Sequence, residues 1–276
     1  MPAHDPRTAE QIREHYVIER ELAARLRVAG KEERRRLYTE VYNELFRRVP
    51  HHPQLAAKTD ASVRAETIYA LKLVRRFINP ESVYLEIGPG DCALALEVAK
   101  LVRTVYAVDV SDEISQGLNP PKNFALVISD GSSIPVPPES IDVVFSDQLM
   151  EHLHPDDARE QLANVYHALK PGGICICITP NRLSGPHDVS RHFDDIATGF
   201  HLKEYTIAEL SAVFREAGFR KLRLLIGARG FSVSVPVVIV RLVESLFEKL
   251  PKQFTKTVAR RFPLRLVLGI KLTGSK

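Results

Sequence analysis

The sequence predicts an α/β fold built on a mostly parallel sheet, and three observations predict it. Short apolar runs that end in polar or acidic residues alternate with helical patterns from about residue 81 onward. The first of these runs, VYLEI, leads into a turn that contains Gly88 and Gly90. A later run, ICICI, follows a Pro-Gly-Gly turn and is expected to be a buried strand.

The turn around residues 86–92 has the order of parts that forms a nucleotide cradle. Gly88 and Gly90 carry no Cβ, so the backbone can turn sharply there and come close to a ligand. We expect residues 91–101 to form a helix whose free N–H groups point at the same place. Glu86 within the turn is unlike an ordinary dinucleotide fingerprint, and Cys92 stands where a third glycine would be expected. Since a glycine pair by itself is not specific, the interpretation depends on the strands that follow.

Each following strand ends in residues that suit a nucleoside. The run 104–111 ends in Asp109, 19 residues after Gly90, where a carboxylate accepts both hydroxyls of a ribose. The run 125–129 is followed by Asp130 and Gly131. The run 141–146 is followed by Asp147, and residues 168–181 read as a helix end, a turn and a fifth strand.

With these motifs in order, residues 80–228 resemble the class I S-adenosylmethionine-dependent methyltransferases, in the small-molecule, methyltransferase-11-like branch. The resemblance implies a Rossmann-like sheet whose last strand is antiparallel, and S-adenosyl-L-methionine as cofactor. It also implies in-line transfer of a methyl group to a small or amphiphilic metabolite. The cofactor roles that it assigns are Glu86 near the methionine amino group, Gly88, Pro89 and Gly90 in the close-approach turn, Asp109 and Val110 at the ribose, Asp130 and Gly131 at the adenine, and Ser146 and Asp147 on the methionine side.

Histidines on the same edge of the sheet are the candidates for a general base. A base is needed only if the acceptor loses a proton, and histidine suits that task near neutral pH. We expect His152 to line the pocket and His187 or His192 to face the acceptor. Arg182 or Arg191 would pair with an anionic group of the acceptor. We expect no metal, because residues 184–195 contain no helical i, i+4 ligand pair.

The chain divides into four expected parts: a helical N-terminal cap over residues 1–80, a cofactor-binding core over 81–228, an amphipathic basic helical insert over 229–262, and a final sheet strand over 263–276. In the cap, Thr8 and Gln11 predict a capping box for a helix that runs to Gly30. A second helix carries Leu37, Val41 and Leu45 on one face. A third is expected from Asp60, burying Ile68, Leu71, Val74 and Ile78, and the core ends with a helix from Thr206 to Gly218 and strands over 219–226 and 265–272.

The insert has two interpretations. Residues 236–250 place Ile239, Leu242 and Leu246 on one helical face, and residues 219–276 carry 13 basic and 2 acidic groups. The helix either covers the site or a second subunit, or it lies on a membrane surface and brings the enzyme to an amphiphilic acceptor. We expect no nucleic-acid partner, since no nucleic-acid-binding module is recognisable.

Composition agrees with an ordinary globular enzyme of the cytoplasm. The 276 residues are 26% charged and 45% apolar, and no apolar stretch is long enough to span a bilayer. Three cysteines suggest no disulfide framework, and Cys175 and Cys177 should point to one face as core residues. Two alternatives stay open: a catalytically silent cofactor-binding or scaffold protein, and a nicotinamide-dependent oxidoreductase, which the acid at Glu86 disfavours.

Overall fold

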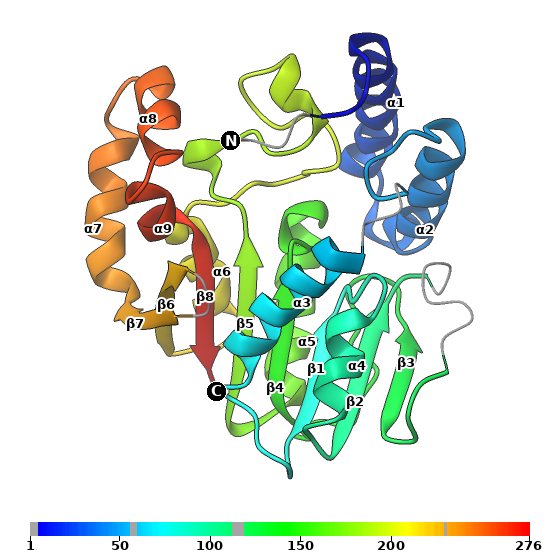
Figure 1. Cartoon of the computed structure of the whole chain (residues 1–276), viewed down its shortest axis with the longest axis vertical. Coiled ribbons are helices and arrows are strands. Elements are labelled where there is room, and N and C mark those ends of the chain that lie inside the picture. Colours follow the sequence, from blue (N-terminus) through cyan, green and yellow to red (C-terminus); the bar gives the residue numbers. More distant parts are fainter. Residues whose placement is uncertain (1–4, 56–59, 112–118, 229–230) are drawn as a thin grey trace.

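A single mixed sheet forms the centre of the molecule (Figure 1). The structure is a computed structural model, and it describes residues 5–55, 60–111, 119–228 and 231–276. Within these residues eight strands lie in the order β3-β2-β1-β4-β5-β8-β6-β7. Their bounds are β1 (Val83–Ile87), β2 (Thr104–Asp109), β3 (Phe124–Ile128), β4 (Ile141–Asp147), β5 (Leu169–Thr179), β6 (Lys221–Ala228), β7 (Phe231–Pro236) and β8 (Ile270–Ser275).

The strand directions confirm the predicted fold class. Strands β1 to β5 pair in parallel, and β8 is inserted antiparallel between β5 and β6. The edge strand β7 is a further antiparallel addition, paired with β6. The carboxyl ends of the parallel strands therefore share one edge of the sheet, which is where such folds bind ligands.

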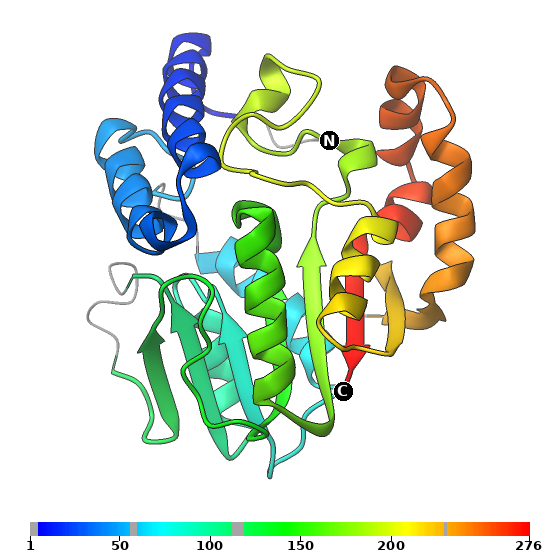
Figure 2. The same ribbon diagram turned by 180° about the vertical axis from the view of Figure 1, so that it is seen from behind.

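Helices cover both faces of the sheet and give it two cores (Figures 1 and 2). The helices α3 (Asp60–Val74) and α4 (Ala93–Ala99) lie on one face, and α5 (Pro155–Ala168) and α6 (Ile207–Glu216) lie on the other. Neighbouring strand residues divide between the cores because side chains alternate along a strand. Cys175 and Cys177 share one of these cores with reduced sulfurs, as predicted.

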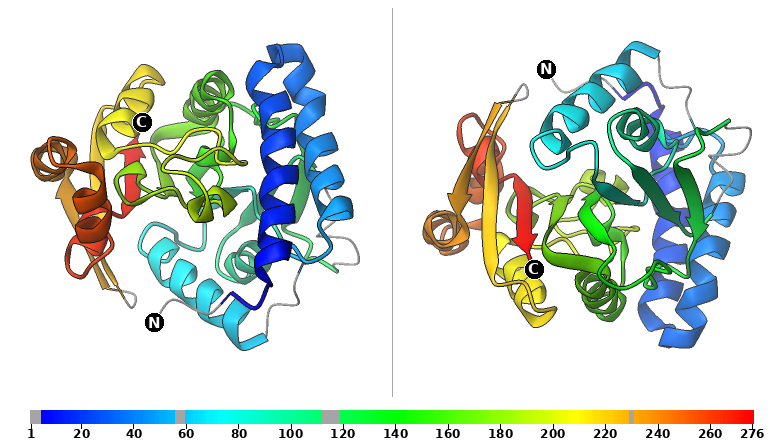
Figure 3. Two further views of the ribbon diagram at one scale, coloured as in Figure 1. Left: turned by 90° about the horizontal axis from the view of Figure 1, so that it is seen from above. Right: turned by 90° about the horizontal axis from the view of Figure 1, so that it is seen from below.

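Two N-terminal helices, α1 (Ala9–Val28) and α2 (Lys31–Arg48), pack beside each other above the carboxyl ends of the strands (Figures 1 and 3). The capping box of Thr8 and Gln11 is confirmed, and so is the buried stripe of the second helix. Buried Arg34 of α2 donates to both carboxylate oxygens of Asp157 on α5 at 2.7 Å. This buried ion pair ties the cap to the core.

The third helix differs from its prediction. It ends at Val74, before Ile78, and Ile68 is 44% exposed. The reason is that α3 packs on α4 through Ala70, Leu73 and Val74, so Ile68 points away from that contact. The helix after the glycine turn starts at Ala93 rather than at residue 91.

The C-terminal region also corrects two predictions. The strand expected over residues 265–272 is wrong at its start, because α9 (Leu264–Leu268) forms there and β8 begins only at Ile270. The helical insert begins instead with strand β7, while residues 229 and 230 lie outside the described residues. The amphipathic helix is α7 (Val237–Glu248), and α8 (Lys252–Ala259) follows it.

The packing of α7 leaves much of its apolar face uncovered. Val237, Val240 and Glu244 are buried, and the Glu244 carboxylate accepts hydrogen bonds from the backbone N–H groups of Ile207 and Ala208 at the start of α6. The apolar face, for which the sequence left a covering role and a membrane-surface role open, holds exposed side chains such as Leu242, which is 66% exposed. No helix among the described residues is both long enough and apolar enough to cross a membrane.

Candidate active site

The glycine turn between β1 and α4 has the close-packed geometry expected of a cofactor cradle. Gly88 and Gly90 have φ angles of +66° and +55°, which side-chain-bearing residues rarely adopt. A Cβ at Gly88 would lie 3.2 Å from the Leu149 side chain. Cys92 also takes a left-handed conformation, with φ of 58°, at the position where the sequence lacks a third glycine. The backbone at Cys92 therefore has the conformation that a glycine would adopt there, and the Cys92 side chain makes this conformation locally strained.

A cavity of about 200 Å³ opens beside this turn. Asp109, at the end of β2, lines it, and Asp109 Oδ1 accepts a hydrogen bond from the Val110 N–H at 2.7 Å. Burial raises the pKa of Asp109, the effect expected of a carboxylate in a partly closed pocket. Of the residues predicted for the site, those that line this first cavity are Gly88, Gly90, Asp109, Val110, Gly131 and His152.

The other predicted cofactor residues do not line this cavity, in contrast to the prediction, namely Glu86, Pro89, Asp130, Ser146 and Asp147. Glu86 is 6% exposed and accepts a hydrogen bond from the Tyr84 hydroxyl at 3.2 Å. Burial raises the pKa of Glu86 to about 8. Asp130 instead caps its own turn by accepting from the N–H groups of Ser132 and Ser133, and its second oxygen lies 3.3 Å from Arg35 Nε.

A second cavity, of about 360 Å³, adjoins the first. The two share Tyr42, Gln54, Gln148 and His152 as lining residues. Ionisable side chains dominate the second cavity, whereas the first holds mainly backbone, apolar and aromatic groups. Its ionisable lining consists of Arg7, His15, Glu19, Tyr42, His52, Glu151, His152, His187, Asp188, Arg191 and His201.

The three predicted histidines occupy three different positions. His152 lies between the two cavities, and burial lowers its pKa to about 3, so its ring is neutral at pH 7. His187 lines the second cavity, with Nε2 3.1 Å from Ser184 Oγ. His192 is exposed, lines neither cavity, and contacts the neighbouring Arg191 guanidinium at 3.1 Å. Of the two arginines proposed for an anionic acceptor, Arg191 lines the second cavity and Arg182 does not.

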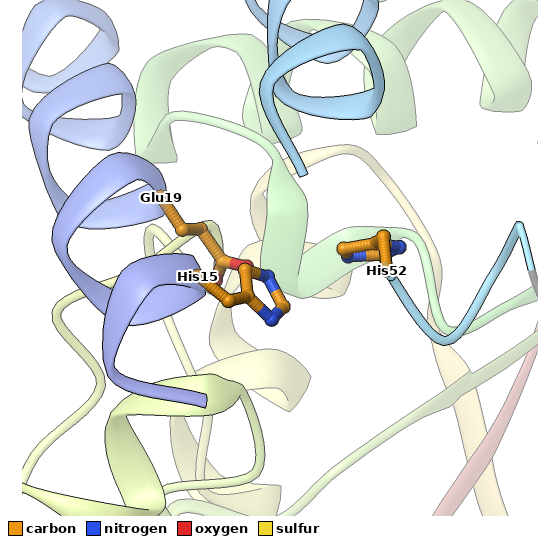
Figure 4. Close-up of side chains that lie close together, drawn as sticks. All are labelled: His15, Glu19 and His52. Atoms are coloured by element: carbon orange, nitrogen blue, oxygen red, sulfur yellow. The ribbon is translucent and has the colours of Figure 1, made fainter. Parts of the chain in front are cut away.

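Sequence reasoning missed two clusters in the second cavity. One is His15, Glu19 and His52, in which one ligand-type atom of each residue lies within 4.8 Å of the others (Figure 4). The i, i+4 spacing of His15 and Glu19 on one helix was the available signal. The other cluster is Glu151, His152 and His201, whose members come from distant parts of the chain.

The cluster around His15 is closed by hydrogen bonds. Arg7 Nη1 donates to His15 Nδ1 at 2.6 Å, so the remaining ring hydrogen is on Nε2 and points at Glu19 Oε2, also at 2.6 Å. Glu19 Oε1 accepts from the Phe200 N–H at 2.9 Å. His52 Nδ1 accepts from the Gln54 N–H at 3.2 Å, which places the His52 hydrogen on Nε2. Neither ring keeps a free lone pair.

Sheet order, glycine turn and Asp109 together define an α/β domain that binds a nucleoside-containing cofactor. Residues 85–177 match the methyltransferase domain family. A protein of Mycolicibacterium smegmatis described as a "probable S-adenosylmethionine-dependent methyltransferase" is 30% identical over 169 residues, covering 60% of this chain and 62% of that protein. A Mycobacterium tuberculosis protein with the same description is 30% identical over 138 residues, 49% of this chain and 47% of that protein.

Solved structures agree at the level of the fold. A methyltransferase structure from Thermotoga maritima superposes with a TM-score of 0.51 at 17% identity, covering 88% of this chain and 97% of that chain. One from Mesorhizobium loti gives 0.51 at 11% identity, covering 78% and 100%. Residues 85–177 therefore match a methyltransferase domain whose relatives are described as S-adenosylmethionine-dependent, on the fold of the class I enzymes, which is the family that the motifs predicted. The chain spans less than two thirds of the length of the two mycobacterial relatives.

Proposed function

We propose that this protein transfers a methyl group from S-adenosyl-L-methionine to a small or amphiphilic acceptor. The observation that carries the proposal is the pair of adjoining cavities with a common wall of Tyr42, Gln54, Gln148 and His152. The first cavity has the glycine turn and the carboxylate that suit the cofactor, and the second offers polar groups to an acceptor. Two compartments that meet at one wall suit a reaction that requires donor and acceptor in line.

The bound cofactor supplies an electrophilic methyl group: the acceptor lone pair bonds to the methyl carbon, and the carbon–sulfur pair of electrons goes to sulfur, leaving S-adenosylhomocysteine. The protein's contribution is to position both partners and to exclude water. Gly88 and Gly90 allow the backbone to approach, and Asp109 accepts from the ribose hydroxyls. His152 lies between the cavities, but burial lowers its pKa to about 3, which makes it too weak a base near neutral pH, so its proposed role is to contact the acceptor.

Titration calorimetry with S-adenosylhomocysteine, with NAD and NADP beside it, tests the cofactor. We expect micromolar binding of S-adenosylhomocysteine alone, and Asp109→Ala should weaken it about 100-fold, the equivalent of about 2.7 kcal/mol. Binding of a nicotinamide nucleotide alone would reject the proposal. Incubation with isotopically methyl-labelled donor and a metabolite extract then separates an enzyme from a silent binding protein, because only the enzyme transfers the label.

An amphiphilic acceptor is supported by the surface of the insert. Helix α7 lies at the edge of the molecule (Figure 1). Its residues Ile239, Leu242 and Leu246 are each more than half exposed. Basic side chains flank them, namely Arg241, Lys249, Lys252, Lys256, Arg260, Arg261 and Arg265. Apolar side chains with a basic border suit the interface of an anionic bilayer. No described residue of this insert lines either cavity, which favours a surface role over a lid.

Co-sedimentation with vesicles tests that surface. We expect the protein to sediment with vesicles containing phosphatidylserine at low salt, and not with vesicles of phosphatidylcholine alone. Leu242→Asp combined with Leu246→Asp should abolish sedimentation while S-adenosylhomocysteine binding stays unchanged. Sedimentation that persists in the double variant would exclude α7 as the contact.

A further inference from the structure

Three side chains with metal-ligand atoms meet in the wall of the second cavity. Glu151 and His152 come from the short 3₁₀ helix after β4, and His201 comes from the segment before α6. One ligand-type atom from each residue lies within 4.8 Å of the others. The rings of His152 and His201 are in contact, with centroids 4.9 Å apart.

The Glu151 carboxylate is only half satisfied by the protein. Its Oε2 accepts a hydrogen bond from Thr179 Oγ1 at 2.8 Å, whereas its Oε1 is buried without a hydrogen-bond partner. The residue is fully buried, at 0% exposure. Leaving such an oxygen unpaired costs about 1–3 kcal/mol, so a partner for it is expected. A cation is the partner that a carboxylate oxygen accepts most strongly.

Both histidines hold their free nitrogen ready for a ligand. His152 Nδ1 lies 2.9 Å from the Tyr42 hydroxyl oxygen and 3.2 Å from the Phe200 carbonyl oxygen. The carbonyl only accepts, so the tautomer that satisfies it has its hydrogen on Nδ1, with the Tyr42 hydroxyl as a second acceptor, and leaves the lone pair on Nε2. His201 Nδ1 donates in the same way to Glu204 Oε1 at 2.7 Å. Glu204 is itself oriented by accepting from the His187 N–H at 2.7 Å. Carbonyl and carboxylate partners of this kind orient the histidines of metal sites.

We propose that Glu151 Oε1, His152 Nε2 and His201 Nε2 bind a divalent first-row metal ion, with Zn²⁺ the best match. Two imidazole nitrogens and one carboxylate oxygen are a ligand set that Zn²⁺ favours when it keeps a further position open. Glu151, His152 and His201 all line the second cavity, and His152 also lines the cofactor cavity, so an acceptor in the second cavity would occupy that open position. An acceptor oxygen or nitrogen would bind there and lose its proton more easily; this role rests on the proposed methyl transfer, whereas the metal binding does not.

Zinc titration of the full-length, tag-free protein tests the site directly. The protein is first treated with a chelator and then competes with a chromophoric zinc indicator, in the absence of cofactor. We expect one Zn²⁺ per chain with a Kd below about 1 μM. Glu151→Gln and His201→Gln should each raise the Kd by about 100-fold, while His15→Gln, a matched change in the closed cluster, should leave it within about threefold.

Binding by the parent weaker than about 10 μM would overturn the proposal. So would parent-like binding by both variants, or loss of binding in His15→Gln alone. Visible absorption bands of Co²⁺ bound to the parent report imidazole ligation without any variant, so a variant that fails to fold leaves the proposal testable; a spectrum identical to aqueous Co²⁺ would reject it. S-adenosylhomocysteine binding is measured separately. A protein that binds zinc but not S-adenosylhomocysteine would support this metal site and reject the proposed function. A protein that binds S-adenosylhomocysteine but not zinc would reject only the metal site.

Discussion

The two clusters of histidine and carboxylate in the second cavity contain the same residue types and use them in opposite ways. In the cluster of His15, Glu19 and His52, each histidine lone pair and both Glu19 oxygens already have a partner within the protein. In the cluster of Glu151, His152 and His201, one oxygen or nitrogen atom of each side chain forms a hydrogen bond within the protein. The second such atom of each side chain is available to a ligand, as Glu151 Oε1 is. The distances between the ligand-type atoms alone do not distinguish the two clusters, because both fall within 4.8 Å.

The difference teaches that the hydrogen-bond partners of a cluster decide its role. A closed cluster contributes to stability, because its charges and donors satisfy one another. An open cluster contributes little to stability and is available to a ligand. The closed cluster of His15, Glu19 and His52 therefore connects the N-terminal helix α1 to Phe200. The open cluster of Glu151, His152 and His201 is the part of the cavity wall that can bind a ligand.

The largest expected effect is on stability, from the same substitution made in each cluster. Glu19→Gln replaces an oxygen that accepts from His15 or Phe200 with an N–H donor, and it should lower the free energy of unfolding by about 3 kcal/mol. Glu151→Gln removes no hydrogen bond to Oε1, so the metal-free protein should change by less than about 1 kcal/mol. Urea unfolding at pH 7 measures both. Equal losses would remove the distinction between closed and open clusters.

Much of the fold could be predicted because its signals are local. The capping boxes at Thr8 and Thr206 and the glycine turn each depend on a few neighbouring residues, and all appear in the structure. Strand β7 could not be predicted, since an edge strand of six residues owes its existence to pairing with β6. The short helix α9 likewise depends on its packing against β6.

The lining of the first cavity could be predicted from the sequence better than the lining of the second cavity. Gly88, Gly90 and Asp109 follow their strands directly, so strand order alone brings them together. Glu151 and His201 are 50 residues apart in the chain, and they meet because the segment before α6 folds back, with the Lys203 N–H donating to the Glu151 carbonyl at 3.1 Å. No periodic pattern in the sequence predicts that this segment folds back to Glu151.

A second effect is the pH dependence of the closed cluster. Burial opposes ionisation of Glu19, but its hydrogen bond with His15 holds the pKa of Glu19 below 4.5. A carboxyl whose pKa is lowered on folding stabilises the protein above its unfolded pKa and loses that contribution as pH falls through the folded pKa. The difference in unfolding free energy between the parent and Glu19→Gln should therefore be full at pH 7 and shrink below about pH 4.5. A gap that is constant from pH 7 to pH 4 would contradict an ionised Glu19.

A third carboxylate, Glu86, extends the comparison because it is buried, accepts a hydrogen bond from Tyr84, and forms no ion pair within the described part of the chain. With its pKa raised to about 8, it is mostly protonated at pH 7 in the free protein. If it pairs with the amino group of the cofactor, binding should release about one proton. Calorimetry of S-adenosylhomocysteine binding in buffers of different ionisation enthalpy measures that number. Glu86→Gln should bring it close to zero, and an unchanged release would assign the proton to another group.

The smallest expected effect concerns His52, the member of the closed cluster farthest from any carboxylate bond. Burial lowers its pKa to about 4, so the ring is neutral at pH 7, and it packs against His15 and Phe46 with centroid distances of 4.6 and 5.3 Å. His52→Asn keeps an acceptor for the Gln54 N–H and loses only ring contacts, which should cost about 1 kcal/mol of unfolding free energy. The zinc affinity of His52→Asn should equal that of the parent. His52 Nδ1 already accepts from Gln54 and His52 Nε2 carries a hydrogen, so neither nitrogen is available to a metal ion. Loss of zinc by a normally folded His52→Asn would mean that a cluster satisfied by hydrogen bonds can still open for a metal, and hydrogen-bond partners would then no longer distinguish the two clusters.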